Sequence, residues 1–466
     1  MTTIDNSDDT SASEDELASY PKPAYAWYVV VLMMCFYVLS FMDRQIIAVM
    51  LEPIKADLDL TDVQISLIGG ISFTIFYSVA GVFIGRLADS LNRPLLIAIG
   101  VFVWSLTTAA CGLVGKFWQL FILRMGVGLG EAALLPSTLS LLSDYFPSKR
   151  LATPTSVFLF GAPIGIGLSF AIGGYLYGVA SEIVNAPGWE DVIMVGGAAA
   201  WKLVLMFLGI VGMLMTMLLV TVREPRNSQQ REKSSEPKSV AKVADAATLD
   251  EVKEYSGQNW IPITALYSCM ALISLAAYSQ GFWDITFLSR TYDWDPATGS
   301  FWYGMVQLFA GLSGMLFGGV VADQLTKRGV QGASVILVLI GAAFSVPFSF
   351  LYPLAETPTM ALTLMVFAIF GSNMCFACAA SAVQRLFPIA MLGLAAGVYY
   401  FISNAVGIGI GPTLVAVLTD YLYEDPQKIN YSLSMVGGIS RGLAFLFMLA
   451  GLKHYRDLMI RRESQA

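Results

Sequence analysis

The sequence predicts an all-α integral membrane protein with twelve transmembrane helices in two pseudo-symmetric bundles of six. Of its 466 residues, 56% are hydrophobic and 13% are charged, whereas a soluble domain carries about 25% charged residues. The apolar residues form long uninterrupted runs, and twelve of these runs reach the roughly 20 residues that a membrane helix needs. One polar segment separates the first six runs from the last six.

The twelve predicted spans begin near Ala26, Ile65, Leu95, Gln119, Thr155, Ala198, Trp260, Ser300, Gly332, Thr359, Leu392 and Tyr431. The polar segment is rich in Ser, Lys and Glu, which is typical of a flexible or partly helical linker. The acidic N-terminal residues do not resemble a signal or transit peptide, because both of those need positive charge. We therefore divide the chain into a tail over residues 1–24, a first bundle over 25–222, a linker over 223–258, a second bundle over 259–454 and a tail over 455–466.

The placement of Lys and Arg predicts the orientation in the membrane. Most of the 27 basic residues fall in the tails, in the linker and in the loops on the same side as the linker. Because an excess of positive charge marks cytoplasmic loops, we expect both termini and the linker to be cytoplasmic. The compact length and the lack of a targeting segment favour a bacterial inner membrane.

Composition argues against several classes of protein. A net charge of −7 does not suit nucleic-acid binding, which needs a basic face. The five cysteines lie in apolar stretches, so we expect free, packed thiols rather than disulfides. Cys375 and Cys378 form a C-x-x-C pair, but on a membrane helix this spacing indicates packing rather than redox chemistry.

Enzymatic activity is the alternative class of function, and the sequence does not favour it. An integral-membrane lipid enzyme needs clustered catalytic residues or metal ligands, but the chain has one histidine and no paired-carboxylate motif at a membrane face. The ATP-binding pattern GxxxxGK[ST] does not occur. We therefore expect no cofactor and no metal, and we expect energy to come from a gradient.

Two short motifs recur in both halves and indicate duplication. The loop after the second span reads GRLADSLNR, from Gly85 to Arg93, and the loop after the eighth reads GVVADQLTK, from Gly319 to Lys327. The fourth and tenth spans both end in Phe-Pro. Duplicated halves are a known way to build a transporter, with the substrate site between them near the middle of the membrane.

The recurring loops contain the candidate gating residues Asp89, Arg93, Asp323 and Lys327. Asp89 with Arg93, and Asp323 with Lys327, are opposite charges at i,i+4 spacing near a helix boundary. We expect them to bridge to a neighbouring helix end and to hold a cytoplasmic gate shut. The alternative is two solvated pairs, each worth a few tenths of a kcal/mol.

The first and fourth spans contain the charges that most need an explanation. The first has only Asp43 and Arg44, and the fourth has only Arg124 and Glu131. Each charge costs roughly 2.5–3.5 kcal/mol at the centre of a bilayer, so these side chains must pair or face water. Arg124 and Glu131 are seven residues apart, almost two full turns, and project from one helix face. We therefore expect the four charges to form one buried cluster.

We interpret this cluster as the site that binds a charged headgroup and carries a coupling proton. Burial raises the pKa of a carboxyl group and a nearby arginine lowers it, so a carboxyl between these influences can titrate. The only histidine, His454, lies at the cytoplasmic end of the last span, so the proton carrier must be Asp43 or Glu131. The alternative is a structural ion-pair network, but buried ion pairs contribute little stability.

The second half does not repeat these charges. Its acidic residue well inside a span is Asp284, which either faces the cavity or pairs with Arg290. Asn373 and Trp283 are further candidates for substrate contacts, with interhelical hydrogen bonding or packing as the alternative. If some aromatic residues line the cavity, one half offers charge and the other an apolar wall, an arrangement that suits an amphiphile.

Three motifs resemble signatures of the major facilitator superfamily. GRLADSLNR is similar to its G-x-x-x-D loop, RMGVGLGEA at Arg124–Ala132 to its R-x-x-x-G-x-G motif, and GAPIGIGLSFAIGG at Gly161–Gly174 to its Gly/Pro-rich motif. Within the superfamily, three features resemble the spinster-type lipid transporters. They are MDRQ at Met42–Gln45, the presence of Glu131 in the RMGVGLGEA motif, and GFWDITFLSR at Gly281–Arg290.

The resemblance implies the major facilitator fold and a transport function. It implies that Asp43 and Glu131 carry protons and that Arg44 and Arg124 act in transport. We expect a monomer that moves a lysophospholipid or sphingoid-type amphiphile by alternating access, coupled to protons. The alternative is a symporter of a small organic anion such as a sugar acid, in which the two arginines hold a carboxylate.

Overall fold

The computed structural model describes residues 20–147, 150–186, 199–225 and 249–463. These residues are almost entirely helical, and no strand occurs among them. Twelve helical stretches are long and apolar enough to cross a membrane: Pro23–Val49, Asp62–Gly85, Arg93–Cys111, Phe117–Tyr145, Thr153–Val184, Ala200–Thr221, Trp260–Tyr292, Pro296–Lys327, Ala333–Leu354, Pro358–Leu386, Leu392–Tyr423 and Pro426–Arg462. The prediction of an all-α protein with twelve spans is therefore confirmed, and each span begins within a few residues of its expected start.

The first half contains spans one to six, several of them broken into two helices. Its elements are α2 (Pro23–Val49), α3 (Leu51–Leu58), α4 (Asp62–Gly69), α5 (Ile71–Ser90), α6 (Arg93–Cys111), α7 (Phe117–Glu131), α8 (Leu134–Tyr145), α9 (Ala152–Leu159), α10 (Gly161–Val184), α11 (Ala200–Thr216) and the 3-10 helix η2 (Met217–Thr221).

The second half follows a short helix within the linker, α13 (Leu249–Gln258). Its elements are α14 (Trp260–Tyr292), α15 (Pro296–Lys327), α16 (Ala333–Leu351), η3 (Tyr352–Leu354), α17 (Pro358–Leu386), η4 (Ile389–Met391), α18 (Leu392–Asn404), the π-helix η5 (Ala405–Ile410), α19 (Gly411–Val417), the π-helix η6 (Leu418–Tyr423), η7 (Pro426–Lys428) and α20 (Ile429–Glu463).

Local sequence explains where several spans begin. The Asp295 carboxylate accepts hydrogen bonds from the backbone N–H groups of Ala297 and Thr298, both at 3.0 Å, at the start of α15. Thr61 caps α4, and its partner Gln64 completes a reciprocal capping box. Such caps satisfy backbone donors that a helix leaves free in its first turn.

The expected boundary at residue 454 is not a structural boundary, because α20 continues to Glu463. Tyr455 is buried in this extension, and its hydroxyl donates to the Ala382 carbonyl oxygen at 3.0 Å. The extra turns are therefore held against α17. Most of the expected linker and the first tail lie outside the described residues.

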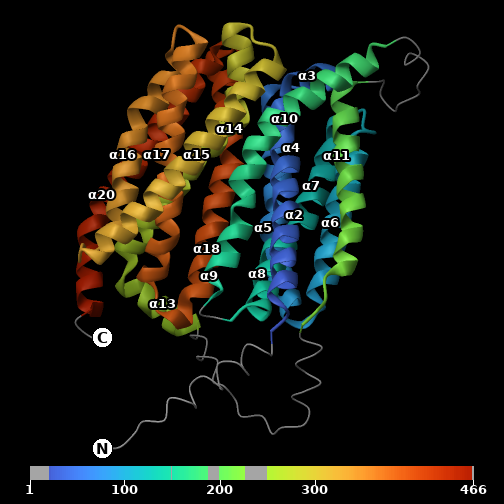
Figure 1. Cartoon of the computed structure of the whole chain (residues 1–466). Helices are drawn as coiled ribbons and strands as arrows, with labels where there is room; N and C mark the ends of the chain where they lie inside the picture. The colour runs from blue at the N-terminus through green and yellow to red at the C-terminus, as the bar shows by residue number, and fades with distance from the viewer. Residues whose placement is uncertain (1–19, 148–149, 187–198, 226–248, 464–466) are drawn as a thin grey trace, which may run out of the picture.

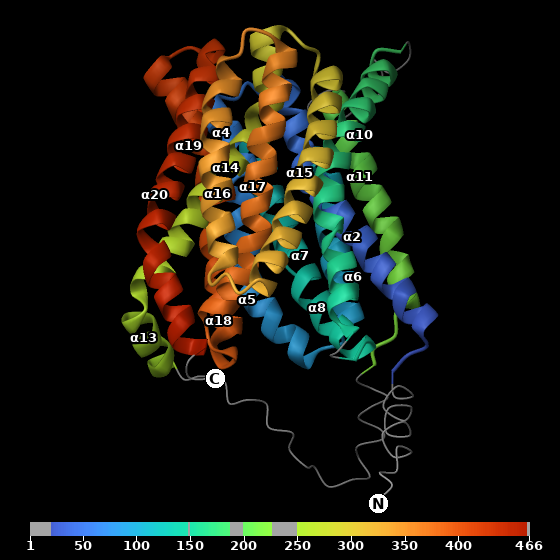
Figure 2. The same cartoon turned by 60° about the vertical axis from the view of Figure 1, so that its left-hand side comes forward.

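The two halves stand side by side, and α2 begins at the same end of the molecule at which α20 ends (Figure 1). We call this the terminal end, and the opposite end, where α3 lies, the distal end. After a 60° turn the spans still run between these two ends (Figure 2). The bundle arrangement predicted from the repeats is therefore present.

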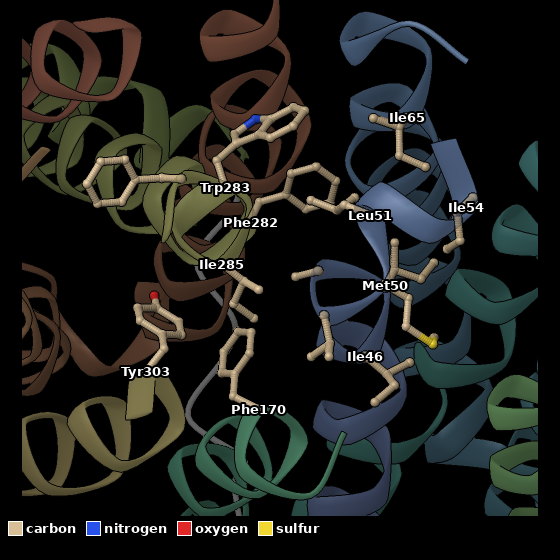
Figure 3. Packing of buried hydrophobic residues seen from close by; sticks show 14 of the residues in the cluster. Ile46, Met50, Leu51, Ile54, Ile65, Phe170, Phe282, Trp283, Ile285 and Tyr303 are labelled. Atoms are coloured by element: carbon tan, nitrogen blue, oxygen red, sulfur yellow. The ribbon is translucent and has the colours of Figure 1, made fainter. Parts of the chain in front are cut away.

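The hydrophobic core joins the halves toward the distal end. One cluster combines Ile46, Leu51 and Ile65 of the first half with Phe282 and Trp283 of the second. The side chains of Leu51 and Phe282 point toward one another across the boundary (Figure 3). Toward the terminal end the buried apolar residues form two separate clusters, one within the second half and one mainly within the first. The described residues therefore close the molecule at its distal end.

Candidate substrate and proton site

The glycines of the fourth span bring α7 directly onto α6. A Cβ atom added to Gly130 would lie 2.6 Å from the backbone nitrogen of Trp104 and 2.7 Å from the carbonyl oxygen of Gly100. No side chain fits between these backbones, so only glycine permits this packing. The close approach fixes the two charged residues of α7, Arg124 and Glu131, inside the first bundle, where both are buried.

The strongest contact of the site joins the first and fourth spans. Arg44 of α2 forms an ion pair with Glu131 of α7, with 2.6 Å between Arg44 Nη2 and Glu131 Oε2. The hydroxyl of Ser40 donates to the same oxygen at 2.8 Å. The other oxygen, Oε1, is buried and has no hydrogen-bond partner within the described part of the chain. Glu131 therefore uses half of its capacity to accept hydrogen bonds.

Asp43 and Arg124 complete the group. The hydroxyl of Thr108 on α6 donates to Asp43 Oδ2 at 2.7 Å. The charge of Arg124 acts on Asp43, but Arg124 Nε and Nη2 have no hydrogen-bond partner among the described residues, and neither has Asp43 Oδ1. The structure thus brings together Asp43, Arg44, Arg124 and Glu131, which we call the four-charge cluster. It keeps donors and acceptors available for a further partner.

An aromatic cage surrounds the Arg44 guanidinium group. Its carbon Cζ lies 4.7 Å from the ring centre of Phe41, 4.5 Å from that of Phe73 and 4.8 Å from that of Tyr77. These distances are within the range of cation–π attraction, which helps to stabilise a cation that has lost water. Arg44 is therefore held as a charged group in apolar surroundings.

The four-charge cluster lies beside the boundary between the two halves. Along α2, residues up to Phe41 pack in the terminal cluster of the first half, and residues from Ile46 pack in the distal cluster that both halves share. Asp43 and Arg44 fall between these clusters. Tyr278 of α14, in the second half, interacts electrostatically with Arg44. The site is thus adjacent to the partner bundle.

The predicted second-half residues are engaged with other protein groups. Asp284 is buried and accepts a 2.6 Å hydrogen bond from the Tyr352 hydroxyl. The Trp283 indole N–H donates to the Pro412 carbonyl oxygen at 2.9 Å. The Asn373 side-chain amide donates to the carbonyl oxygen of Ile369 on its own helix at 3.0 Å. In this conformation none of these contacts is made to the four-charge cluster.

Arg290 does not pair with Asp284, so that alternative is corrected. Its guanidinium group forms ion pairs with Glu52 and Asp62 of the first half, each at 2.7 Å. Lys55 also contacts Asp62, at 2.5 Å. We call the group Glu52, Lys55, Asp62 and Arg290 the distal lock. It joins the halves at the end that is already closed by apolar packing.

Arg441 was not predicted from the sequence as a site residue. It lies in α20 and is fully buried. Its Nη2 donates to the Ser372 hydroxyl at 2.8 Å, and its Nη1 donates to Ser349. A signal was available, since Arg441 stands within an apolar run of the last span.

The structure describes the side chains of three of the four expected gating residues. Arg93 is buried and forms ion pairs with Asp144, at 2.7 Å, and with Glu224; the side chain of Asp89 lies outside the described residues. Asp323 and Lys327 are exposed and make no ion pair with any described residue. Water competes with such an exposed pair, and ordering two long side chains costs entropy.

The family model described as Major Facilitator Superfamily matches residues 33–412, which is most of the chain. This chain belongs to the major facilitator superfamily. It is thus a multi-pass membrane protein of a transporter superfamily rather than of an enzyme family.

Individual proteins give a finer resemblance. The MFS-type efflux pump of Mycolicibacterium smegmatis is 26% identical over 452 residues, covering 96% of this chain and 98% of the pump. The sphingosine-1-phosphate transporter SPNS2 of Danio rerio is 24% identical over 406 residues, covering 83% and 75%. A crystal structure of a bacterial homolog of the human lysosomal transporter spinster, inward-facing and unoccupied, has a TM-score of 0.77 at 23% identity and covers 95% of this chain and 98% of that one. This superfamily member therefore resembles the spinster-type proteins in sequence and fold.

Proposed function

We propose that this protein is a proton-coupled secondary active transporter that moves an amphiphile with an anionic headgroup, of the lysophospholipid or sphingoid type, by alternating access. The observation that carries the proposal is the ion pair between Arg44 and Glu131 inside the bundle, at 2.6 Å, beside an Arg124 with two unpartnered nitrogens. The site holds two cations and two carboxylates with unused donors and acceptors. Its arginines can therefore exchange a carboxylate partner for a substrate anion.

The ion pair provides a route for coupling. When a proton neutralises Glu131, Arg44 loses its counter-charge and becomes available to a substrate anion. Conversely, a headgroup that engages Arg44 leaves Glu131 without its cation, which favours proton binding there. The two ligands therefore favour the same state of the protein, and such coupling is reciprocal by thermodynamic necessity. Proton and anionic substrate should move together.

Asp43 is the second proposed proton carrier of the cluster. Its one hydrogen bond, from Thr108 at 2.7 Å, supports the charged form, and the charge of Arg124 does the same. A substrate anion that attracts Arg124 would weaken that support. Asp43 and Glu131 would then respond to the same event, each through its own arginine.

The surroundings of the cluster favour an amphiphile. Aromatic rings of Phe41, Phe73 and Tyr77 contact the Arg44 guanidinium group, so a headgroup bound there would lie next to apolar surface. An alkyl chain gains about 0.8 kcal/mol for each CH₂ group that it buries. The resemblance to a sphingosine-1-phosphate transporter supports the same substrate class.

The remaining parts of the proposal concern cellular context. The excess of Lys and Arg on the side of the linker supports cytoplasmic termini, which makes the terminal end the cytoplasmic end. The similarity to a pump from Mycolicibacterium smegmatis supports a bacterial inner membrane. We propose that the protein acts as a monomer, since one chain contains both halves of the transport unit.

The first test is uptake by purified protein in liposomes with an imposed pH gradient, using a panel of lysolipids and sugar acids. We expect accumulation of a lysolipid, driven by the gradient. Glu131→Gln and Asp43→Asn should reduce gradient-driven accumulation by about tenfold or more, because each substitution removes an interaction of at least about 1.4 kcal/mol. Exchange of substrate across the membrane without a gradient should survive, which shows that the variants are folded.

Two results would contradict the proposal. Full gradient-driven accumulation in either variant would remove that carboxylate from the mechanism. Uptake of a sugar acid that lysolipids do not inhibit would favour a small-anion symporter, in which Arg44 and Arg124 hold a carboxylate.

A further inference from the structure

A second group of buried polar side chains lies in the second half of the protein. It contains Asp284 of α14, Tyr303 of α15, Tyr352 of η3 and Arg441 of α20, and all four are buried. The Tyr352 hydroxyl donates to Asp284 Oδ1 at 2.6 Å, and the side-chain amide of Gln307 donates to the Tyr303 hydroxyl at 2.6 Å. Residues of α14, α15, η3 and α20 therefore act on one carboxylate.

Arg441 has hydroxyl partners but no carboxylate within ion-pair distance among the described residues. It donates to Ser372 at 2.8 Å and to Ser349, and Ser349 also accepts from the Gln280 amide at 2.7 Å. A lone cation in a membrane span costs roughly 2.5–3.5 kcal/mol. Asp284 acts electrostatically on Arg441, so the two charges partly offset each other without direct contact.

The titratable and charged groups that face Asp284 can be named completely for the described residues. They are Tyr303 on α15, Tyr352 on η3 and Arg441 on α20. None of them belongs to the first half, and no hydrogen bond or ion pair in the described part of the chain joins them to the four-charge cluster. Asp284 can therefore gain or lose a proton independently of Glu131.

Helix α14 connects this carboxylate to the closed distal end. Asp284 lies six residues before Arg290 on the same helix, and Arg290 holds Glu52 and Asp62 of the first half. Trp283, the residue before Asp284, donates to the Pro412 carbonyl oxygen of α19 at 2.9 Å, and the Arg290 guanidinium group lies 6.0 Å from the Trp283 ring centre. A change of charge at Asp284 thus acts on the helix that carries the distal lock.

We propose that Asp284 is a second proton-binding site, which Arg441 keeps in electrostatic balance and which exchanges its proton when the distal lock opens. This inference rests on the proposed proton-coupled transport and adds one proton to each cycle. A proton arriving at Asp284 neutralises the carboxylate that Tyr352 supports. Arg441 is then left with uncharged partners, the hydroxyl groups of Ser349 and Ser372 and the Gly437 carbonyl oxygen, which favours a different packing of α14 against α20. Release of the proton restores the arrangement seen here.

The test is the number of protons moved per substrate, measured in liposomes as the pH gradient that just balances an opposing substrate gradient. We expect the ratio to fall by one in Asp284→Asn relative to the unmodified protein. Glu424→Gln, an exposed acidic residue at the distal end, serves as the matched control and should leave the ratio unchanged. Glu131→Gln should also lower the ratio, by the proton carried at the four-charge cluster, and should leave the proton carried at Asp284.

Tyr352→Phe provides a second variant in case Asp284→Asn folds poorly. It keeps the ring and removes the hydroxyl that supports the charged carboxylate, so Asp284 should retain its proton to a higher pH. We expect an unchanged ratio and a rise of about one unit in the pH at which transport is half-maximal. A purely structural role would lower the transport rate at every pH without this shift.

The outcomes separate the two proposals. If the unmodified protein couples protons and Asp284→Asn has the same ratio, Asp284 is not a proton-binding site, while the proposed function stands. An unshifted profile in Tyr352→Phe would contradict the inference in the same way. If the unmodified protein moves substrate without protons, the proposed function fails and this inference fails with it.

Discussion

Thr108 is the residue whose contribution can be isolated most cleanly. Its hydroxyl donates to Asp43 Oδ2 at 2.7 Å, and Thr108→Val removes this donor with little change of shape. Because a donated hydrogen bond favours the charged form, the pH at half-maximal transport should rise by about one unit. The maximal rate should stay within about twofold, since the carboxylate itself remains. The measurement is the pH profile of uptake in liposomes.

The neighbouring threonine provides a matched control. Thr107 donates to the carbonyl oxygens of Val103 and Trp104 on its own helix, both at 2.9 Å. Thr107→Val should leave the pH profile unchanged. An equal shift in both variants would mean that the profile reports the packing of α6 and not the charge on Asp43.

At this scale the sequence predicts isolated charges better than it predicts their partners. Asp43, Arg44, Arg124 and Glu131 stand out because they are the only charges of two apolar runs. The seven-residue spacing on α7 places two of them on one face. The contact of Asp43 with Thr108 joins α2 to α6 across 65 residues of sequence. Such a tertiary contact has no signature in local spacing.

The repeated loop motifs make different contacts in the two halves. In the first half Arg93, at the start of α6, reaches Asp144 of α8 and Glu224 beyond η2. Arg93→Met removes the buried cation that contacts both carboxylates. We expect a loss of about 3 kcal/mol of stability, the usual cost of removing one member of a buried pair. The measurement is the unfolding midpoint of the purified protein in detergent.

Lys327→Met is the corresponding change in the second half. Lys327 is exposed, so its replacement should alter stability by less than about 0.5 kcal/mol. Equal losses in the two variants would contradict the asymmetry described here and would restore the symmetric gating expected from the repeated motif.

The repeats correctly indicate two matching bundles, because bilayer thickness fixes the length of each span and duplication copies the order of the spans. They do not predict equivalent side-chain contacts. The partner of Arg93 is Glu224, 131 residues further along the chain. Arg441 also escaped prediction: its apolar surroundings mark it as a charge within the last span, but its partners Ser349 and Ser372 lie on other helices and have no signature in local spacing.

The whole molecule combines a distal closure with a charged site just below it. Apolar packing and the distal lock join the halves at one end, while each half keeps its own core toward the terminal end. The sequence predicts the two halves and the region between them. It does not predict which end is closed, because the same helices can close the molecule at either end. The relative free energies of the two conformations decide which one is populated.

The most direct test of the central claim is to drive protons with substrate. Liposomes containing the purified protein and an internal pH indicator, with no initial pH gradient, are given an inward gradient of a transported lysolipid. We predict that the interior acidifies in step with uptake of the lysolipid, and that Glu131→Gln acidifies the interior less for each lysolipid taken up. Uptake with no movement of protons in the unmodified protein, or equal acidification in Glu131→Gln, would contradict the account.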